Sequence, residues 1–177
     1  DALAQASRAA AQATGWQPLT SVTLLAPIPR PRQNVVCVGM NYAAHAIESQ
    51  RARGREPKLP TVPVFFTKAV TAVASPWGDF VLDPKVTQEL DYEVELAFII
   101  GPGGKNIAKA DALQHVYGYT VANDISARDL QNNHQQFFKG KSLDGACPLG
   151  PWIVTADEVP DPGNLTVRLR VNGEQRQ

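Results

Sequence analysis

The stretch LDYEVEL, residues 90–96, alternates apolar and acidic side chains in the way that is typical of a β-strand. Successive side chains of a strand point to opposite faces, so Asp91, Glu93 and Glu95 are predicted to share one face opposite an apolar, core-facing side. Unscreened carboxylates roughly 7 Å apart repel each other unless water or a cation lies between them. The stretch therefore indicates either a site for a hard divalent cation or the solvated acidic face of an ordinary antiparallel strand.

The rest of the chain has the composition of a soluble globular protein. Its 177 residues, 44% of them hydrophobic, are enough for one sizeable core. Seventeen basic and seventeen acidic residues cancel, and no basic stripe supports binding to nucleic acid or to an anionic membrane. No apolar run is long enough to span a bilayer and no signal peptide is evident, so a cytoplasmic protein is expected. Cys37 and Cys147 lack metal-site or disulfide spacing and are predicted to be small buried hydrophobes.

Strand patterns dominate the chain. Apolar or β-branched segments predict strands at 19–25, 34–39, 62–68, 117–124 and, after a turn, within 147–155. A helix is predicted over the alanine-rich residues 1–14. We expect an N-terminal helix and strand segment, residues 1–25, and one main domain, residues 26–177. A strand at 165–171 and a turn at Asn172 and Gly173 predict a hairpin whose return strand is cut short, so we expect the natural protein to continue past Gln177.

Two positions outside the acidic strand carry candidate chemistry. His45 and Glu48 are three residues apart on a predicted helix after GMN, so they lie on one face. A carboxylate makes an imidazole more basic, which suits a general base that activates water, although a surface pair gives the same pattern. Lys68 ends a predicted strand, where it could hold an anion or be a solvated tip.

A further acid is predicted at the end of another strand. YGYTVAND, residues 117–124, delivers Asp124, and the short helix that follows carries Arg128 and Gln131 outward. FFKGKSLD, residues 137–144, supplies Lys141. This segment resembles the end of a phosphate-binding loop. That interpretation is rejected, because Gln135 stands where the first glycine of such a loop is needed.

Five ordered motifs within about residues 25–177 closely resemble the fumarylacetoacetate hydrolase family: GMNYAAHAIE, VFFTKAVTAV, LDYEVELAFIIG, GYTVANDISARDLQ and FKGKSLDGACPLGPWIV. The resemblance implies an α+β domain with a mixed β-roll or β-sandwich of the fumarylacetoacetase C-terminal-domain type, here truncated at its C-terminal side. It also implies a homodimer, a bound Mg²⁺ or Mn²⁺ ion, and a small 2-oxo or 1,3-dioxo acid as substrate.

The resemblance assigns roles to individual side chains. The implied metal ligands are Glu93, Glu95 and Asp124. The implied catalytic residues are the water-activating His45 and Glu48, together with Lys141, which stabilises developing negative charge. The predicted substrate contacts are Arg128, Gln131 and Lys68.

These roles predict a divalent-metal-dependent hydrolase that cleaves a carbon–carbon bond of an acylpyruvate or fumarylacetoacetate-like acid. The same enolate chemistry supports an alternative, a decarboxylase or isomerase of a 2-oxo or 2-hydroxy-diene dicarboxylic acid in aromatic catabolism. A second alternative is a non-catalytic, metal-stabilised binding module. An adjacent base and cation argue against the module, because a purely structural ion site needs neither.

Overall fold

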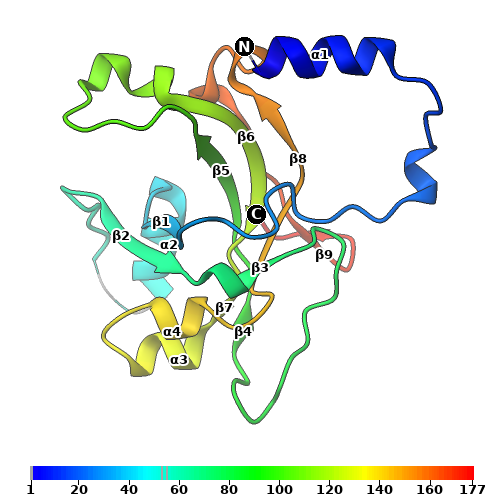
Figure 1. Ribbon diagram of the computed structural model, residues 1–177. Coiled ribbons are helices and arrows are strands. Elements are labelled where there is room, and N and C mark those ends of the chain that lie inside the picture. The colour runs from blue at the N-terminus through cyan, green and yellow to red at the C-terminus, as the bar shows by residue number, and fades with distance from the viewer. Residues whose placement is uncertain (1, 53, 55) are drawn as a thin grey trace.

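The computed structural model describes residues 2–52, 54 and 56–177, and a curved four-stranded sheet lies at its centre (Figure 1). The strand order is β3 (Val73–Ala74), β8 (Cys147–Thr155), β6 (Val116–Asn123) and β5 (Val94–Ile100). β3 runs parallel to β8, whereas β8, β6 and β5 pair antiparallel. A mixed sheet with few helices agrees with the predicted α+β class.

Three two-stranded sheets accompany the central one. β1 (Val35–Gly39) pairs with β2 (Val64–Lys68), β4 (Leu90–Asp91) with β7 (Ser126–Ala127), and β9 (Arg170–Val171) with β10 (Glu174–Gln175). The last pair is the hairpin predicted from the sequence, and both turn residues have positive φ, 51° at Asn172 and 85° at Gly173, as a type I′ turn requires. Of the strand predicted at 165–171, only its last two residues form β9.

The helices are short. They are α1 (Ala2–Gln12), α2 (Ala43–Ala52), α3 (Arg128–Asn133) and α4 (Phe138–Lys141). The 3₁₀ turns are η1 (Leu19–Ser21), η2 (Val70–Ala72), η3 (Lys109–His115), η4 (Ala156–Glu158) and η5 (Pro162–Asn164). The strand predicted at 19–25 is wrong, because this segment forms η1 and its remaining residues pair with none of the described strands. Among the described helices, none is long and apolar enough to cross a membrane.

Glycine permits the close contact of β6 with β8. A Cβ atom on Gly118 would lie 2.4 Å from the carbonyl oxygen of Val154 and 2.6 Å from the side chain of Ile153. Any larger residue would push the two strands apart. The close contact fixes the path of β6, whose C-terminal end delivers Asp124.

The acidic strand differs from its prediction. The stretch 90–96 is not one strand, because β4 ends at Asp91 and β5 begins at Val94. Glu93 lies in the break, where its carbonyl oxygen accepts from the N–H of Asp124 at 2.8 Å. Glu93 is only 7% exposed, whereas Phe98, an apolar residue further along β5, is 56% exposed. The carboxylate is buried because cations surround it, and this excludes a solvated acidic face at Glu93.

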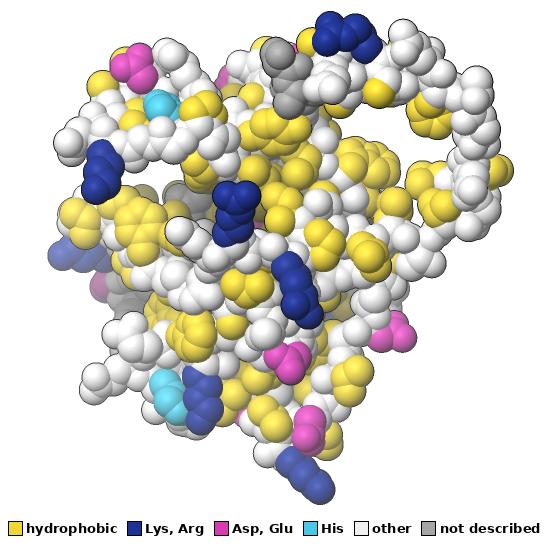
Figure 2. Space-filling model, viewed as in Figure 1, with side chains coloured by type: hydrophobic (Ala, Val, Ile, Leu, Met, Phe, Trp, Pro, Cys, Tyr) yellow, Lys and Arg dark blue, Asp and Glu magenta, His cyan; other side chains and the backbone are white. Residues whose placement is uncertain are grey.

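The apolar core is small for a chain of this size. Ala26, Ala122 and Leu149 form its buried cluster. The solvent-accessible surface is 12925 Å², against about 8400 Å² expected for a compact protein of this mass. Hydrophobic side chains accordingly cover much of the face in Figure 2. Large apolar side chains that remain more than half exposed include Val36, Phe65, Phe98 and Trp152.

Candidate active site

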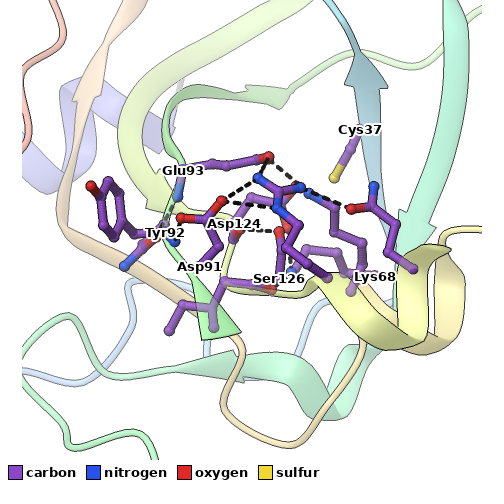
Figure 3. Close-up of polar contacts among 12 residues, drawn as sticks. Cys37, Lys68, Asp91, Tyr92, Glu93, Asp124 and Ser126 are labelled. Carbon is purple, nitrogen blue, oxygen red and sulfur yellow. Dashed lines mark hydrogen bonds and ion pairs between the residues drawn. The ribbon is translucent and has the colours of Figure 1, made fainter. Parts of the chain in front are cut away.

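Glu93 and Asp124 are held side by side at the centre of the candidate site (Figure 3). The backbone N–H of Asp124 donates to the carbonyl of Glu93, and the N–H of Glu93 donates to Oδ1 of Asn123 at 3.2 Å. These two contacts join the break before β5 to the end of β6. Because both contacts involve the backbone, the two carboxylates are placed by the chain path and not by flexible side chains alone.

Two buried lysines neutralise these carboxylates. Lys141, at the end of α4, places its Nζ 2.7 Å from Oε2 of Glu93 and 2.8 Å from Oδ2 of Asp124. Lys68, at the end of β2, donates to Oδ1 of Asp124 at 2.5 Å and to the carbonyl of Ile125 at 3.1 Å. Lys68 is 1% exposed and Lys141 is 2% exposed. Neither is a solvated tip, and burial of these charges is tolerated because each is paired.

Arg128 closes the opposite side of Glu93. Its NH2 atom donates to Oε1 of Glu93 at 2.5 Å, its Nε to Oδ2 of Asp91 at 2.9 Å, and its NH1 to Oε1 of Gln131 at 2.8 Å. Burial alone would raise the pKa of Glu93, but the charges of Lys141 and Arg128 outweigh it and hold this pKa below its usual value. Glu93 is therefore ionised at neutral pH.

A glycine brings α4, and with it Lys141, against this cluster. A Cβ atom on Gly140 would lie 2.7 Å from the carbonyl oxygen of Ala127 and 2.7 Å from the backbone nitrogen of Gln131. Only glycine lets α4 pack this closely on β7 and α3. The position next to it is Lys141, so the glycine sets where the ammonium lies.

Glu95 lies on β5, opposite Ala122 of β6, and has a different environment from Glu93. Burial raises its pKa to about 7, and the neighbouring charges of Glu93 and Asp124 act in the same direction. Among the described ion pairs, none involves Glu95. Its carboxylate instead hydrogen-bonds the hydroxyl of Tyr42. Glu95 thus faces two other carboxylates with no described cation in contact, and the charge of Lys141 only partly offsets their effect on its pKa.

The donor set suits a hard divalent cation. The cluster has a net charge of one negative when Glu95 is ionised. Its four acids are Asp91, Glu93, Glu95 and Asp124, and its three cations are Lys68, Arg128 and Lys141. As the side chains stand, no three described Asp, Glu, His or Cys side chains form a ready metal cage, because the cations hold the oxygens of Glu93 and Asp124. The net negative charge and the all-oxygen donors nevertheless fit Mg²⁺ or Mn²⁺. The predicted ligand set stays a prediction.

The cluster borders a cavity of about 1280 Å³ between the β1–β2 pair and β5. Glu93, Glu95, Asp124, Arg128 and Lys141 all line it. Such a cavity exceeds the needs of a three- or four-carbon acid. It therefore leaves room for a substrate at the carboxylate cluster.

The prediction of two buried cysteines is confirmed for Cys147 only. Cys147 is buried, whereas Cys37 is half-buried beside the cluster (Figure 3). Burial raises the pKa of Cys37 to about 12 and that of Cys147 to about 11. Both thiols are therefore protonated at neutral pH and are poor nucleophiles.

The structure places most of the predicted site residues in one cluster. The structure brings together Lys68, Glu93, Glu95, Asp124, Arg128, Gln131 and Lys141. His45 and Glu48 lie on α2, but the side chain of His45 is outside the described part of the structure, so the water-activating pair stays a prediction. Sequence reasoning placed Asp91 on the acidic face but gave it no role, and in the structure it pairs with Arg128. It missed Tyr42, which no residue pattern distinguishes.

Comparisons with known proteins give consistent matches. Residues 34–177 match the model of the family described as fumarylacetoacetate (FAA) hydrolase, C-terminal. The chain is 51% identical over 160 residues to the oxaloacetate tautomerase YisK of Bacillus subtilis, covering 90% of this chain and 52% of that protein. The chain thus spans about half the length of this relative.

Two solved structures are also similar. A fumarylacetoacetate hydrolase from psychrophilic Exiguobacterium antarcticum is 49% identical with a TM-score of 0.74, over 86% of this chain and 52% of that one. A 5-carboxymethyl-2-hydroxymuconate delta-isomerase from Mycobacterium smegmatis is 41% identical with a TM-score of 0.76, over 93% of this chain and 61% of that one.

Proposed function

Because this chain belongs to the fumarylacetoacetate hydrolase family, we propose that it interconverts the keto and enol forms of a small 2-oxo dicarboxylic acid of the oxaloacetate class. The similarity to an oxaloacetate tautomerase supports this reaction. The observation that carries it is the position of Lys141, whose ammonium contacts Glu93 and Asp124 at the cavity wall. An enol oxygen bound there would meet a buried positive charge.

Glu93, Glu95 and Asp124 are the side chains that would hold a Mg²⁺ or Mn²⁺ ion. When bound, the ion supplies Lewis-acid polarisation of the 2-oxo group. A divalent cation changes the charge of the cluster from one negative to one positive. The loaded site therefore favours an anionic substrate such as a 2-oxo acid.

Lys141 has one donor to offer a substrate. An ammonium has three N–H groups, and Glu93 and Asp124 take two of those on Lys141. The third can donate to the oxygen that becomes negative when a proton leaves C3 of the substrate. A fixed donor in a water-poor site stabilises such an oxyanion more than water does.

Arg128 and Gln131 are the proposed partners of the substrate carboxylate, since both line the cavity beside Glu93. His45, one helical turn from Glu48 on α2, is the proposed group that takes the C3 proton and returns it. This role needs no attacking water. It therefore differs from the hydrolysis that the sequence led us to expect.

Carbon–carbon hydrolysis of an acylpyruvate is the second candidate. The likeness to a structure named fumarylacetoacetate hydrolase favours it. The hydrolase uses the same donor set, but His45 would then activate water for attack on the distal carbonyl. The two reactions differ in their products and can be separated by assay.

The test supplies the chain with Mn²⁺ and freshly dissolved oxaloacetate and follows the ultraviolet absorbance of the enol, with CO₂ release measured in parallel. The proposal expects faster keto–enol equilibration without CO₂, and loss of the acceleration in Glu93→Gln. Cleavage of acetylpyruvate without effect on oxaloacetate supports the hydrolase instead. If no 2-oxo acid reacts and Mn²⁺ only raises the melting temperature, the domain is a metal-stabilised module and the proposal is wrong.

A further inference from the structure

Tyr42 connects the start of α2 to the edge of the central sheet. It immediately precedes the helix, where its carbonyl oxygen accepts from the N–H of Ala46 at 2.9 Å. Its side chain is half-buried and lines the cavity. β5 is an edge strand, so alternate N–H groups point away from β6. The hydroxyl of Tyr42 accepts one of these, the N–H of Leu96, at 3.2 Å.

The same hydroxyl contacts the carboxylate of Glu95, the residue before Leu96. A phenol carries one proton and can accept hydrogen bonds at its oxygen. The N–H of Leu96 is a donor and uses the oxygen as acceptor, so the phenolic proton is left for Glu95. The hydroxyl of Tyr42 thus accepts from the N–H of Leu96 and donates to the carboxylate of Glu95.

Glu95 forms none of the described ion pairs, in contrast to Glu93 and Asp124, and Lys141 acts on it only through its charge. Lysines and an arginine orient those two carboxylates, whereas Tyr42 is the described hydrogen-bond donor to Glu95. We propose that Tyr42 is a positioning residue that holds Glu95 in the orientation in which it joins Glu93 and Asp124 around a divalent cation. This inference rests on the proposed function, which makes Glu95 a ligand.

A fixed carboxylate binds an ion more tightly than a mobile one, because less side-chain freedom is lost on binding. Groups that orient metal ligands typically contribute 10- to 100-fold in metal affinity. Tyr42→Phe keeps the ring and removes only the hydroxyl. We therefore expect this variant to bind Mn²⁺ roughly 10- to 100-fold more weakly than the wild-type chain.

The experiment is a calorimetric titration of Mn²⁺ into the wild-type chain and into Tyr42→Phe, Tyr117→Phe and Glu95→Gln. Tyr117 is an exposed tyrosine on β6 outside the cavity lining, so its variant is the matched control and should bind Mn²⁺ as the wild type does. Thermal unfolding of each metal-free variant separates lost packing from lost positioning. Tautomerase kcat at saturating Mn²⁺ should stay close to wild type in Tyr42→Phe, while the half-saturating Mn²⁺ concentration rises.

The outcomes are distinct. Unchanged Mn²⁺ affinity in Tyr42→Phe, with weakened binding in Glu95→Gln, overturns the role of Tyr42 and leaves the proposed ligand set intact. Unchanged affinity in Glu95→Gln instead overturns the ligand set. If Tyr42→Phe weakens Mn²⁺ binding equally in the wild-type and Glu95→Gln backgrounds, the residue does not act through Glu95 and the inference is wrong.

Discussion

Nζ of Lys141 lies 2.7 Å from Oε2 of Glu93, and both side chains are more than nine-tenths buried. The contact joins the end of α4 to the break between β4 and β5. It is part of a network in which buried carboxylates depend on buried cations. The first predictions follow from removing members of this network.

Lys141→Met leaves Glu93 and Asp124 with one fewer cation in a buried site. Removing one partner of a buried pair typically costs about 3–5 kcal/mol of unfolding free energy, because the remaining charge is uncompensated. We expect a loss of this order in urea denaturation. Lys139→Met is the control, since Lys139 is exposed two residues away, and it should change the unfolding free energy little. Equal stability of the two variants would contradict the network.

Arg128→Lys keeps the positive charge but removes the guanidinium group, whose three nitrogens donate to Asp91, Glu93 and Gln131 at the same time. Each lost charge-assisted hydrogen bond is worth about 1.5–3 kcal/mol. We expect weaker oxalate binding in the presence of Mg²⁺ and a higher KM for oxaloacetate. Arg168→Lys, at an exposed position outside the cavity lining, should leave both constants unchanged.

Gly140→Ala places a methyl group 2.7 Å from two backbone atoms, which cannot move away as a flexible side chain could. The helix α4 must shift, and Lys141 shifts with it. We expect a loss of about 1–3 kcal/mol in stability, as for overpacking, together with a loss of activity. Gly103→Ala has open space around its Cβ and is the control. Wild-type activity in Gly140→Ala would show that the placement of α4 does not matter.

The raised pKa of Glu95 makes stability of the metal-free chain depend on pH. The ordinary pKa of this carboxyl is 4.5, and in the folded chain it is about 7. Between these values the carboxyl is protonated in the folded state but ionised in the unfolded state. Glu95 therefore contributes fully to stability below about pH 4.5, and this contribution is lost as the pH rises through 7. Comparing urea denaturation across this range, we expect the decline to be smaller in Glu95→Gln. An identical decline in both proteins would contradict this environment for Glu95.

Much of the sheet could be predicted from local patterns. VPVFFTK and YGYTVAND are apolar or β-branched and form β2 and β6, and CPLGPWIVT forms β8. The segment 19–25 has a similar pattern but forms no strand, because a strand needs a partner and no strand in the described part of the chain pairs with it. Pairing is a property of the whole fold and is not encoded in a short window.

The sequence predicts which residues belong to the site, but not how their charges are buried and paired. The ordered motifs identified Glu93, Asp124, Arg128 and Lys141 correctly as neighbours. The alternation in 90–96 gave no sign of the break before Val94, since the break arises from contacts with Asn123 and Asp124 some thirty residues later. A lysine at a strand end is normally solvated, so the burial of Lys68 could not be read from the chain. A homodimer stays a prediction from family resemblance.

The central claim is that this cluster, with a divalent cation bound, binds 2-oxo acids. Calorimetric titration of oxalate, a planar mimic of the enolate of such an acid, tests it most directly, with and without Mg²⁺, in the wild-type chain and in Glu93→Gln. The account predicts binding that requires Mg²⁺ and is lost in Glu93→Gln. Binding of equal strength without Mg²⁺ or in Glu93→Gln, or no binding in any condition, would contradict it.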